Sequence, residues 1–163
     1  MTTVDTKTAP RRSLTLGSID ELERELDRID AAIQAGTIGH TGNWTPGQIG
    51  EHCAKFMRFS IDGFPTLAPG ILRFFGRMFL LKKAMGPEPL PSGFKLPKQA
   101  SVLLPSDSVT DATGIGELRM QVKRLQNGER MTQTSPLLGK LTHEQWVVLQ
   151  LKHCAMHLSF ITY

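Results

Sequence analysis

The chain has 163 residues, 40% hydrophobic and 21% charged, which suits one globular domain with a substantial core. A net charge of +4 is a mild cationic excess, and aromatic residues make up only 7%, so nucleic-acid binding is not expected. With two cysteines and no apolar segment of a secretory signal in residues 1–16, we expect a cytoplasmic protein with reduced thiols rather than a disulfide-stabilised secreted one.

The N-terminal residues 1–14 hold few large apolar groups, so we expect a flexible tail before a single helical domain over residues 15–163. Ser18 and Glu21 form the sequence pattern of a capping box, which predicts a helix that ends near Gly36. The apolar residues of this helix recur at spacings of three and four, and they are Ile19, Leu22, Leu26, Ile29 and Ile33.

A second helix is predicted from Thr45, Pro46 and Gln48, which supply an N-cap, a proline in the first turn and a capping box. It is expected to run to about Asp62. Its inward face places one histidine among mainly apolar side chains, namely Ile49, His52, Cys53, Phe56, Phe59 and Ser60.

The most apolar segment, residues 71–85, is too short and too charged to cross a bilayer, which needs about 20 mainly apolar residues. It predicts an extra short helix whose cationic side faces solvent. We expect its apolar side chains to cover the core, with a substrate pocket as the alternative. Binding of its cations to an anionic substrate or a membrane surface is a further alternative. The side chains concerned are Phe74, Phe75, Met78, Phe79 and Leu80, with Arg73, Arg77, Lys82 and Lys83.

Residues 86–105 carry five of the ten prolines, which exclude a long helix and predict an extended crossover. A further helix is expected from Asp107 to about Gln126, with Gly114 and Gly116 weakening its middle.

Thr142 and Gln145 cap a last helix that is expected to reach the chain end. The predicted fold is therefore all-α, a four-helix bundle with one long proline-rich crossover and the extra short helix.

Three histidines are candidate metal ligands. His153 and His157 differ by about 40° of rotation and about 6 Å of rise on the last helix, so both rings can converge on one ion. His52 is the best third ligand, because it lies on the apolar face that must meet the last helix. Neutral imidazoles suit zinc, nickel, copper and iron, and three ligands leave a position open. The alternative is that these histidines bind no metal.

Gln150, Cys53 and Cys154 lie near the three histidines but are not proposed as metal ligands. Gln150 lies one turn before His153 and is a candidate contact for a substrate or a water at the site, or else a polar residue of the bundle. Cys53 and Cys154 follow proposed ligands directly, and each lies about 100° around its helix from the histidine. We interpret both cysteines as buried apolar residues rather than as metal ligands or a redox pair.

A zinc-protease motif is absent, although His143 and Glu144 begin like one. The motif H-E-x-x-H requires a second histidine where this chain has Val147. Glu144 is interpreted as a carboxylate favoured at a helix N-terminus, and His40 and His143 as loop or capping residues.

Two segments carry the proposed ligands: NWTPGQIGEHCAKF, with His52, and SPLLGKLTHEQWVVLQLKHCAMHLSF, with His153 and His157. These segments are similar to the DinB/YfiT-like superfamily of small bacterial metalloproteins. The resemblance covers about residues 18–160 of the chain. More narrowly, the segments resemble an uncharacterised branch with a G-K-L-T-x-E-x-W segment before the last helix. The resemblance implies a four-helix bundle, often dimeric, whose zinc or nickel ion is held by these three histidines.

The resemblance also implies a reaction class. The superfamily includes metal-dependent hydrolases and thiol transferases, in which the metal activates water or a low-molecular-weight thiol. The sequence places no carboxylate as a general base, and the fold does not transfer a substrate, so catalytic residues stay unassigned. The alternative from another class is a non-catalytic scaffold or dimerisation protein with an empty or structural metal site, for which residues 71–85 are a candidate homodimer interface.

Overall fold

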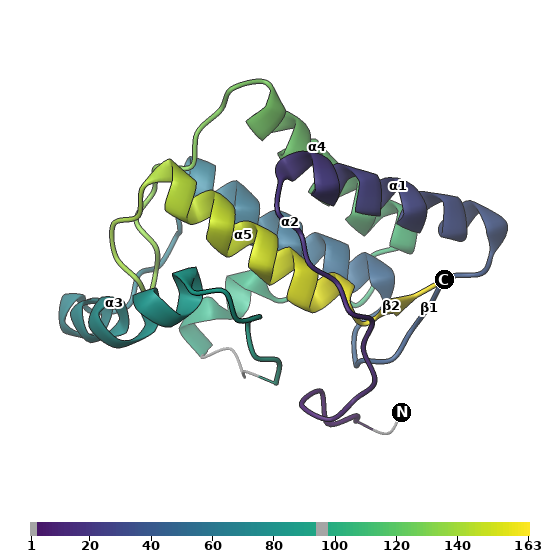
Figure 1. The fold of residues 1–163 in the computed structure, drawn as a ribbon, viewed down its shortest axis with the longest axis horizontal. Coiled ribbons are helices and arrows are strands. Elements are labelled where there is room, and N and C mark those ends of the chain that lie inside the picture. The colour runs from purple at the N-terminus through teal and green to yellow at the C-terminus, as the bar shows by residue number, and fades with distance from the viewer. Residues whose placement is uncertain (1–2, 94–97) are drawn as a thin grey trace.

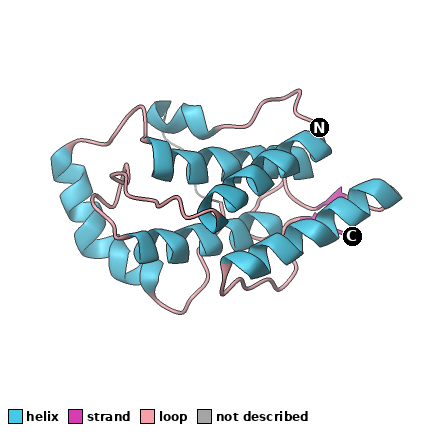
Figure 2. Ribbon diagram, turned by 90° about the horizontal axis from the view of Figure 1, so that it is seen from above, coloured by secondary structure: helices cyan, strands magenta, loops and turns pink. Residues whose placement is uncertain are grey.

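The computed structural model describes residues 3–93 and 98–163. Within these ranges the chain is mostly helical, with five α-helices, one short 3₁₀ helix and a two-stranded sheet (Figure 1). The mostly helical fold agrees with the predicted class. The sheet is a feature that the sequence did not predict, and it lies beside the C-terminus (Figure 2).

The first helix, α1, spans Ile19–Ala35, as predicted. The Ser18 hydroxyl accepts a hydrogen bond from the N–H of Glu21, and Gly36 ends the helix in the left-handed conformation with φ of 68°. The Glu21 carboxylate binds the N–H of Gly17 at 2.6 Å instead of that of Ser18, so the reciprocal half of the expected capping box is displaced by one residue.

Helices α2, Pro46–Asp62, and α5, His143–Leu158, begin where the sequence predicts, and each has a complete capping box. The prediction that the last helix reaches the chain end is wrong. After α5 the chain turns into strand β2, Ile161–Thr162, which pairs antiparallel with β1, Gly39–His40. The sheet satisfies backbone groups of the C-terminus that a frayed helix end would expose.

Helix α4 spans Asp111–Gln126 and begins later than the predicted Asp107, because the Thr110 hydroxyl caps it by accepting from the N–H of Thr113. Its Gly114 allows a close approach to α2. A Cβ added at Gly50 of α2 would lie 2.5 Å from the carbonyl carbon of Gly114, and a Cβ added at Gly114 would overlap the carbonyl oxygen of Gly47. The glycines therefore fix the spacing of two packed helices.

The core lies between α1, α2, α4 and α5, and α3 lies to one side of it (Figure 1). Each of the four helices contributes fully or almost fully buried side chains. They include Leu22, Leu26 and Ile29 of α1, Ile49 and Met57 of α2, Ile115, Leu118 and Val122 of α4, and Trp146 and Leu158 of α5.

Helix α3, Gly70–Met85, forms where an extra helix is predicted, but its orientation is not the predicted one. The predicted packing of its apolar residues over the core is wrong, because Phe74 is 61% exposed and Phe79 is 66% exposed. The prediction of an outward cationic side is confirmed for Arg77, Lys82 and Lys83, which are exposed, and is wrong at Arg73, which is half-buried. The exposed Arg77 donates to backbone carbonyls of the loop before α5.

The described helices include none long and apolar enough to cross a membrane. The predicted crossover lies partly outside the described residues, at 94–97; after that gap the chain forms the 3₁₀ helix η1, Lys98–Leu103.

The N-terminal segment makes specific contacts with the helices. Arg12 forms an ion pair with the buried Glu25 at 2.6 Å, and its N–H donates to the carbonyl of Ser159 at 2.9 Å. The mobility of residues 1–14 stays a prediction.

Candidate metal centre

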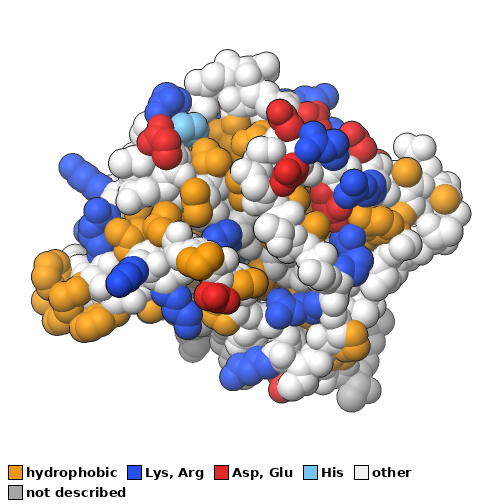
Figure 3. Space-filling model, in the orientation of Figure 1, with side chains coloured by type: hydrophobic (Ala, Val, Ile, Leu, Met, Phe, Trp, Pro, Cys, Tyr) orange, Lys and Arg blue, Asp and Glu red, His pale blue; other side chains and the backbone are white. Residues whose placement is uncertain are grey.

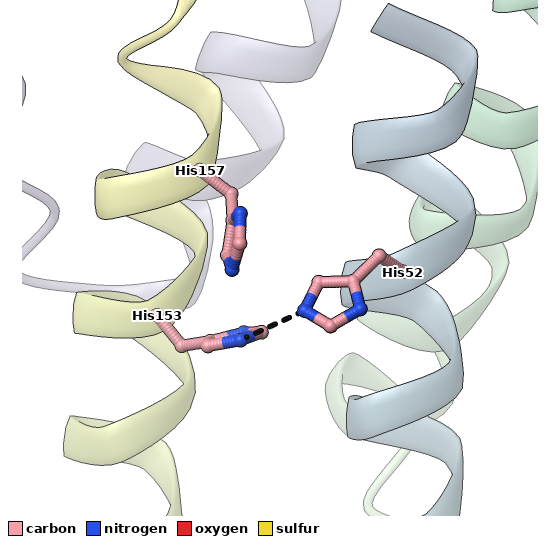
Figure 4. A group of neighbouring side chains, drawn as sticks. All are labelled: His52, His153 and His157. Atoms are coloured by element: carbon pink, nitrogen blue, oxygen red, sulfur yellow. Dashed lines mark hydrogen bonds between the residues drawn. The ribbon is translucent and has the colours of Figure 1, made fainter. Parts of the chain in front are cut away.

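The three predicted ligands come together between two helices. His52 projects from α2 toward His153 and His157 of α5, and the three rings point toward one another (Figure 4). The Nε2 atoms of His52 and His153 lie 3.2 Å apart, and one ring nitrogen from each of the three residues lies within 4.8 Å of the others. The four-residue spacing on α5 therefore brings both of its rings to one point opposite α2.

This spacing fits a divalent transition-metal ion. Bonds of about 2.0–2.1 Å to a tetrahedral ion separate two nitrogen donors by about 3.3 Å, close to the distance between the His52 and His153 nitrogens. Three neutral imidazoles are also a donor set found in catalytic zinc sites. The residues present could hold such an ion with one position left open.

A backbone carbonyl fixes the orientation of His52. Its Nδ1 lies 2.7 Å from the carbonyl oxygen of Leu103, at the end of η1. A carbonyl only accepts hydrogen bonds, so Nδ1 carries the proton and the Nε2 lone pair faces the other two histidines. Metal-binding histidines are commonly oriented in this way by a partner behind the ring.

Burial keeps the three rings uncharged at neutral pH. It lowers the pKa of His52, and it lowers the pKa of His153 and His157 well below the usual range, where the neighbouring imidazoles add to the effect. His52 is buried, whereas His153 and His157 are half-buried. The neutral imidazole is the form that binds a metal ion.

Comparison with protein-family models identifies the family of the chain. The model of the family described as "Protein of unknown function (DUF1569)" matches residues 8–163. The chain belongs to the DUF1569 family. Comparisons with curated proteins and with solved structures give no match. The family description names no activity for this DUF1569 chain.

Aromatic rings surround the histidines of this DUF1569 chain. Trp44 stacks on His157 with ring centroids 5.6 Å apart, and it lies 4.8 Å from the ring of His52. Phe56 lies 4.7 Å from the ring of His153. The resulting apolar wall lowers the local dielectric and strengthens interactions with any bound ion.

Glu51, next to His52 in sequence, does not join the cluster. Its carboxylate binds the Lys55 ammonium at 2.7 Å and the N–H of Ser106 at 2.6 Å. Burial alone would raise the pKa of Glu51, but these hydrogen bonds lower it overall. Glu51 and Lys55 therefore attach the segment after η1 to α2, which supports the contact between Leu103 and His52.

Gln150 is fully buried one turn before His153 on α5. Its Nε2 donates to the carbonyl of Phe56 at 3.1 Å and to the Ser60 hydroxyl at 3.4 Å. Its Oε1 has no partner among the described residues, and the same holds for the buried Nδ1 of His153. Two unpaired polar atoms thus accompany the cluster on one helix.

The two cysteines are buried free thiols, as the sequence predicts, and neither belongs to the histidine cluster. Burial raises the pKa of the Cys53 thiol well above its usual range, and the adjacent Cys154 adds to the rise. The other histidines have structural contacts: His143 accepts from the N–H of Met131, and the exposed His40 contacts the carbonyl of Gly42.

The sequence did not predict two groups of the site, the backbone carbonyl of Leu103 and the ring of Trp44. Leu103 acts through its backbone carbonyl, which every residue type carries, so its side chain gives no signal. Trp44, eight residues before His52, belongs to the segment that resembles the superfamily, but the sequence assigned it no contact with the histidines. It lies directly before the N-cap Thr45, where it reaches both α2 and α5.

Proposed function

We propose that this DUF1569 protein is a DinB/YfiT-like metalloprotein that binds one zinc or nickel ion through His52, His153 and His157. The observation that carries the proposal is the convergence of three neutral imidazoles from two rigid helices, with a 3.2 Å separation that suits two ligands of one ion. The packing of α1, α2, α4 and α5 around a common core supports the relation to the superfamily.

Residues around the three histidines orient the ligands and shield the site. The hydrogen bond from His52 Nδ1 to Leu103 directs one lone pair toward the ion, and Trp44 and Phe56 limit the access of water. We assign to Gln150 a positioning role, in which its unpartnered Oε1 accepts a hydrogen bond from the Nδ1–H of His153 through a water molecule. When bound, the ion would supply Lewis acidity that lowers the pKa of a water or a thiol at its open position.

The reaction that the site supports best is transfer involving a low-molecular-weight thiol. A thiol activated by a metal needs no protein carboxylate as base. Glu51, the carboxylate beside His52, is already bound by Lys55 and Ser106, and the cluster itself contains none. Metal-dependent hydrolysis is the second reaction to be assayed, because the same ion could activate water.

Elemental analysis of untagged protein tests the site. We expect about one zinc or nickel ion per chain in the wild type, as three protein ligands to one ion require. The double variant His153→Ala, His157→Ala should lose the ion, whereas His40→Ala, which changes an exposed histidine outside the cluster, should retain it.

Equal metal content in the wild type and the double variant would refute the site. Absence of metal from all three proteins, even after incubation with zinc or nickel, would favour the non-catalytic scaffold instead.

A further inference from the structure

Helix α3 presents a continuous apolar surface to solvent. Its only buried residues are Gly76 and Ala84. At about 100° per residue, six of its exposed apolar side chains fall within an arc about 160° wide. They are Ile71, Leu72, Phe74, Phe75, Met78 and Phe79. Contiguous exposed patches of this kind mark interaction sites.

The apolar side chains of α3 form an ordered group. The rings of Phe75 and Phe79 stack with centroids 6.2 Å apart, and Phe74 meets Phe75 edge to face at 5.6 Å. In the space-filling view these side chains gather at the left edge of the molecule, where α3 lies, with basic side chains beside them (Figure 3). The patch therefore combines aromatic bulk with positive charge.

The charge of α3 is entirely positive. The helix carries Arg73, Arg77, Lys82 and Lys83 and no Asp or Glu. Among the residues that the structure describes, none of these four cations takes part in an ion pair. Arg77 binds only backbone carbonyls, which leaves its charge uncompensated, and Lys82 and Lys83 are exposed at the C-terminal end.

Contacts on the opposite side hold α3 in place with this face outward. Lys152 of α5 donates to the carbonyls of Ala84 at 2.9 Å and Gly86 at 2.8 Å, at the negative end of the helix dipole. Gly76 lies against the carbonyl of Leu137, where a larger residue would collide. The exposed face needs no rearrangement to meet a partner.

The positive charge of α3 favours an anionic bilayer over a second copy of the chain as its partner. A second copy of the chain, docked through α3, would bring two helices with four cations each together without a carboxylate from either helix. An anionic bilayer supplies both an apolar layer and negative headgroups, and lysines can extend from the apolar face to the headgroups.

We propose that α3 binds the surface of an anionic lipid bilayer, lying in the interface with Phe74, Phe75 and Phe79 inserted and Lys82 and Lys83 at the headgroups. This interaction surface is separate from the histidine cluster and does not depend on metal. The metal centre would thus belong to a protein that docks on a membrane without crossing it.

Co-sedimentation of the full chain with vesicles tests this proposal. We expect binding to phosphatidylcholine vesicles that contain about one-third phosphatidylglycerol, and weaker binding as salt rises, because the headgroup attraction is screened. The variant Phe74→Asp, Phe79→Asp removes apolar insertion, and the variant Lys82→Glu, Lys83→Glu reverses the headgroup contact. Each should reduce binding by at least about tenfold.

A matched control is Met120→Asp, Lys123→Glu, which changes an exposed apolar residue and an exposed lysine of α4 away from the patch. It should bind as the wild type does. Since all the substituted side chains are exposed, far-ultraviolet circular dichroism should show each variant folded.

Three results would overturn the proposal. The first is no binding of the wild type to the anionic vesicles at low salt, and the second is equal binding by the α3 variants. The third is a wild-type dimer in sedimentation equilibrium that Phe74→Asp, Phe79→Asp converts to monomer, which would assign the patch to a second copy.

Discussion

Helices α3 and α5 have the same length of 16 residues, yet their apolar residues have opposite surroundings. In α5, seven residues are buried, among them Trp146 and Gln150, and the two histidines face α2. In α3, most of the large apolar side chains are exposed, and Leu81 and Met85 are the ones that pack partly against the core. An apolar helical face is therefore not by itself evidence of a core position, since what matters is whether another element covers it.

Removing one aromatic side chain from each helix should give the largest contrast. Trp146 is 0% exposed, and its indole N–H donates to the carbonyl of Gln133. We expect Trp146→Ala to lower the free energy of unfolding by about 3–5 kcal/mol, and Phe79→Ala to change it by less than about 0.5 kcal/mol. Urea denaturation monitored by circular dichroism measures both; similar losses would mean that α3 is packed in solution.

A methyl group added where α4 approaches α2 most closely should have the next largest effect on the free energy of unfolding. Gly114→Ala places a Cβ against the carbonyl of Gly47, and we expect a loss near the upper end of about 1–3 kcal/mol. Gly116, two residues on, has nothing within 4 Å of an added Cβ. Gly116→Ala should therefore stabilise the protein by up to about 1 kcal/mol, as helix propensity predicts. Thermal denaturation of the pair checks the contrast, and equal destabilisation would contradict the close packing of α2 and α4.

The exposed ion pair between Asp62 of α2 and Arg124 of α4 should contribute least to the free energy of unfolding. Hydrogen bonds from Arg124 lower the pKa of Asp62, so this carboxylate stabilises the fold above its unfolded pKa of about 3.9. We expect Asp62→Asn to lower the unfolding free energy by about 0.2–1 kcal/mol at neutral pH, since the side chain is nearly half exposed.

The pH dependence of this stability difference shows whether the charge of the Asp62 carboxylate causes it. As the pH falls through the lowered pKa, Asp62 takes up a proton and the difference between wild type and Asp62→Asn should vanish. Denaturant titrations across the acid range measure it. A difference that stays constant with pH would mean that the carboxylate charge is not its source.

The start of α2 and of α5 and the ligand candidates were predictable because the signals are local. Thr45 and Thr142 bond to backbone groups three residues away, and four-residue spacing sets His153 beside His157. The orientation of α3 was not predictable, because periodicity defines an apolar face without saying what covers it. The Leu103 contact to His52 joins residues far apart in the chain, and the β1–β2 pairing depends on two-residue strands too short for an alternating pattern.

The N-terminal segment illustrates the same limit. Its Arg12 reaches the buried Glu25, whose other partners are Arg28 and Tyr163, and the sequence did not predict this contact. Such a contact joins opposite charges across the fold, and a sequence pattern read along one segment carries no sign of it.

The central claim is that three histidines from α2 and α5 hold one ion. The most direct test is a crystal structure of the metal-loaded protein with an anomalous-difference map collected at the absorption edge of the metal. We expect one strong peak between His52, His153 and His157, about 2.0–2.1 Å from one nitrogen of each ring. A map with no peak among these rings, or with the ion held by other side chains, would contradict the claim.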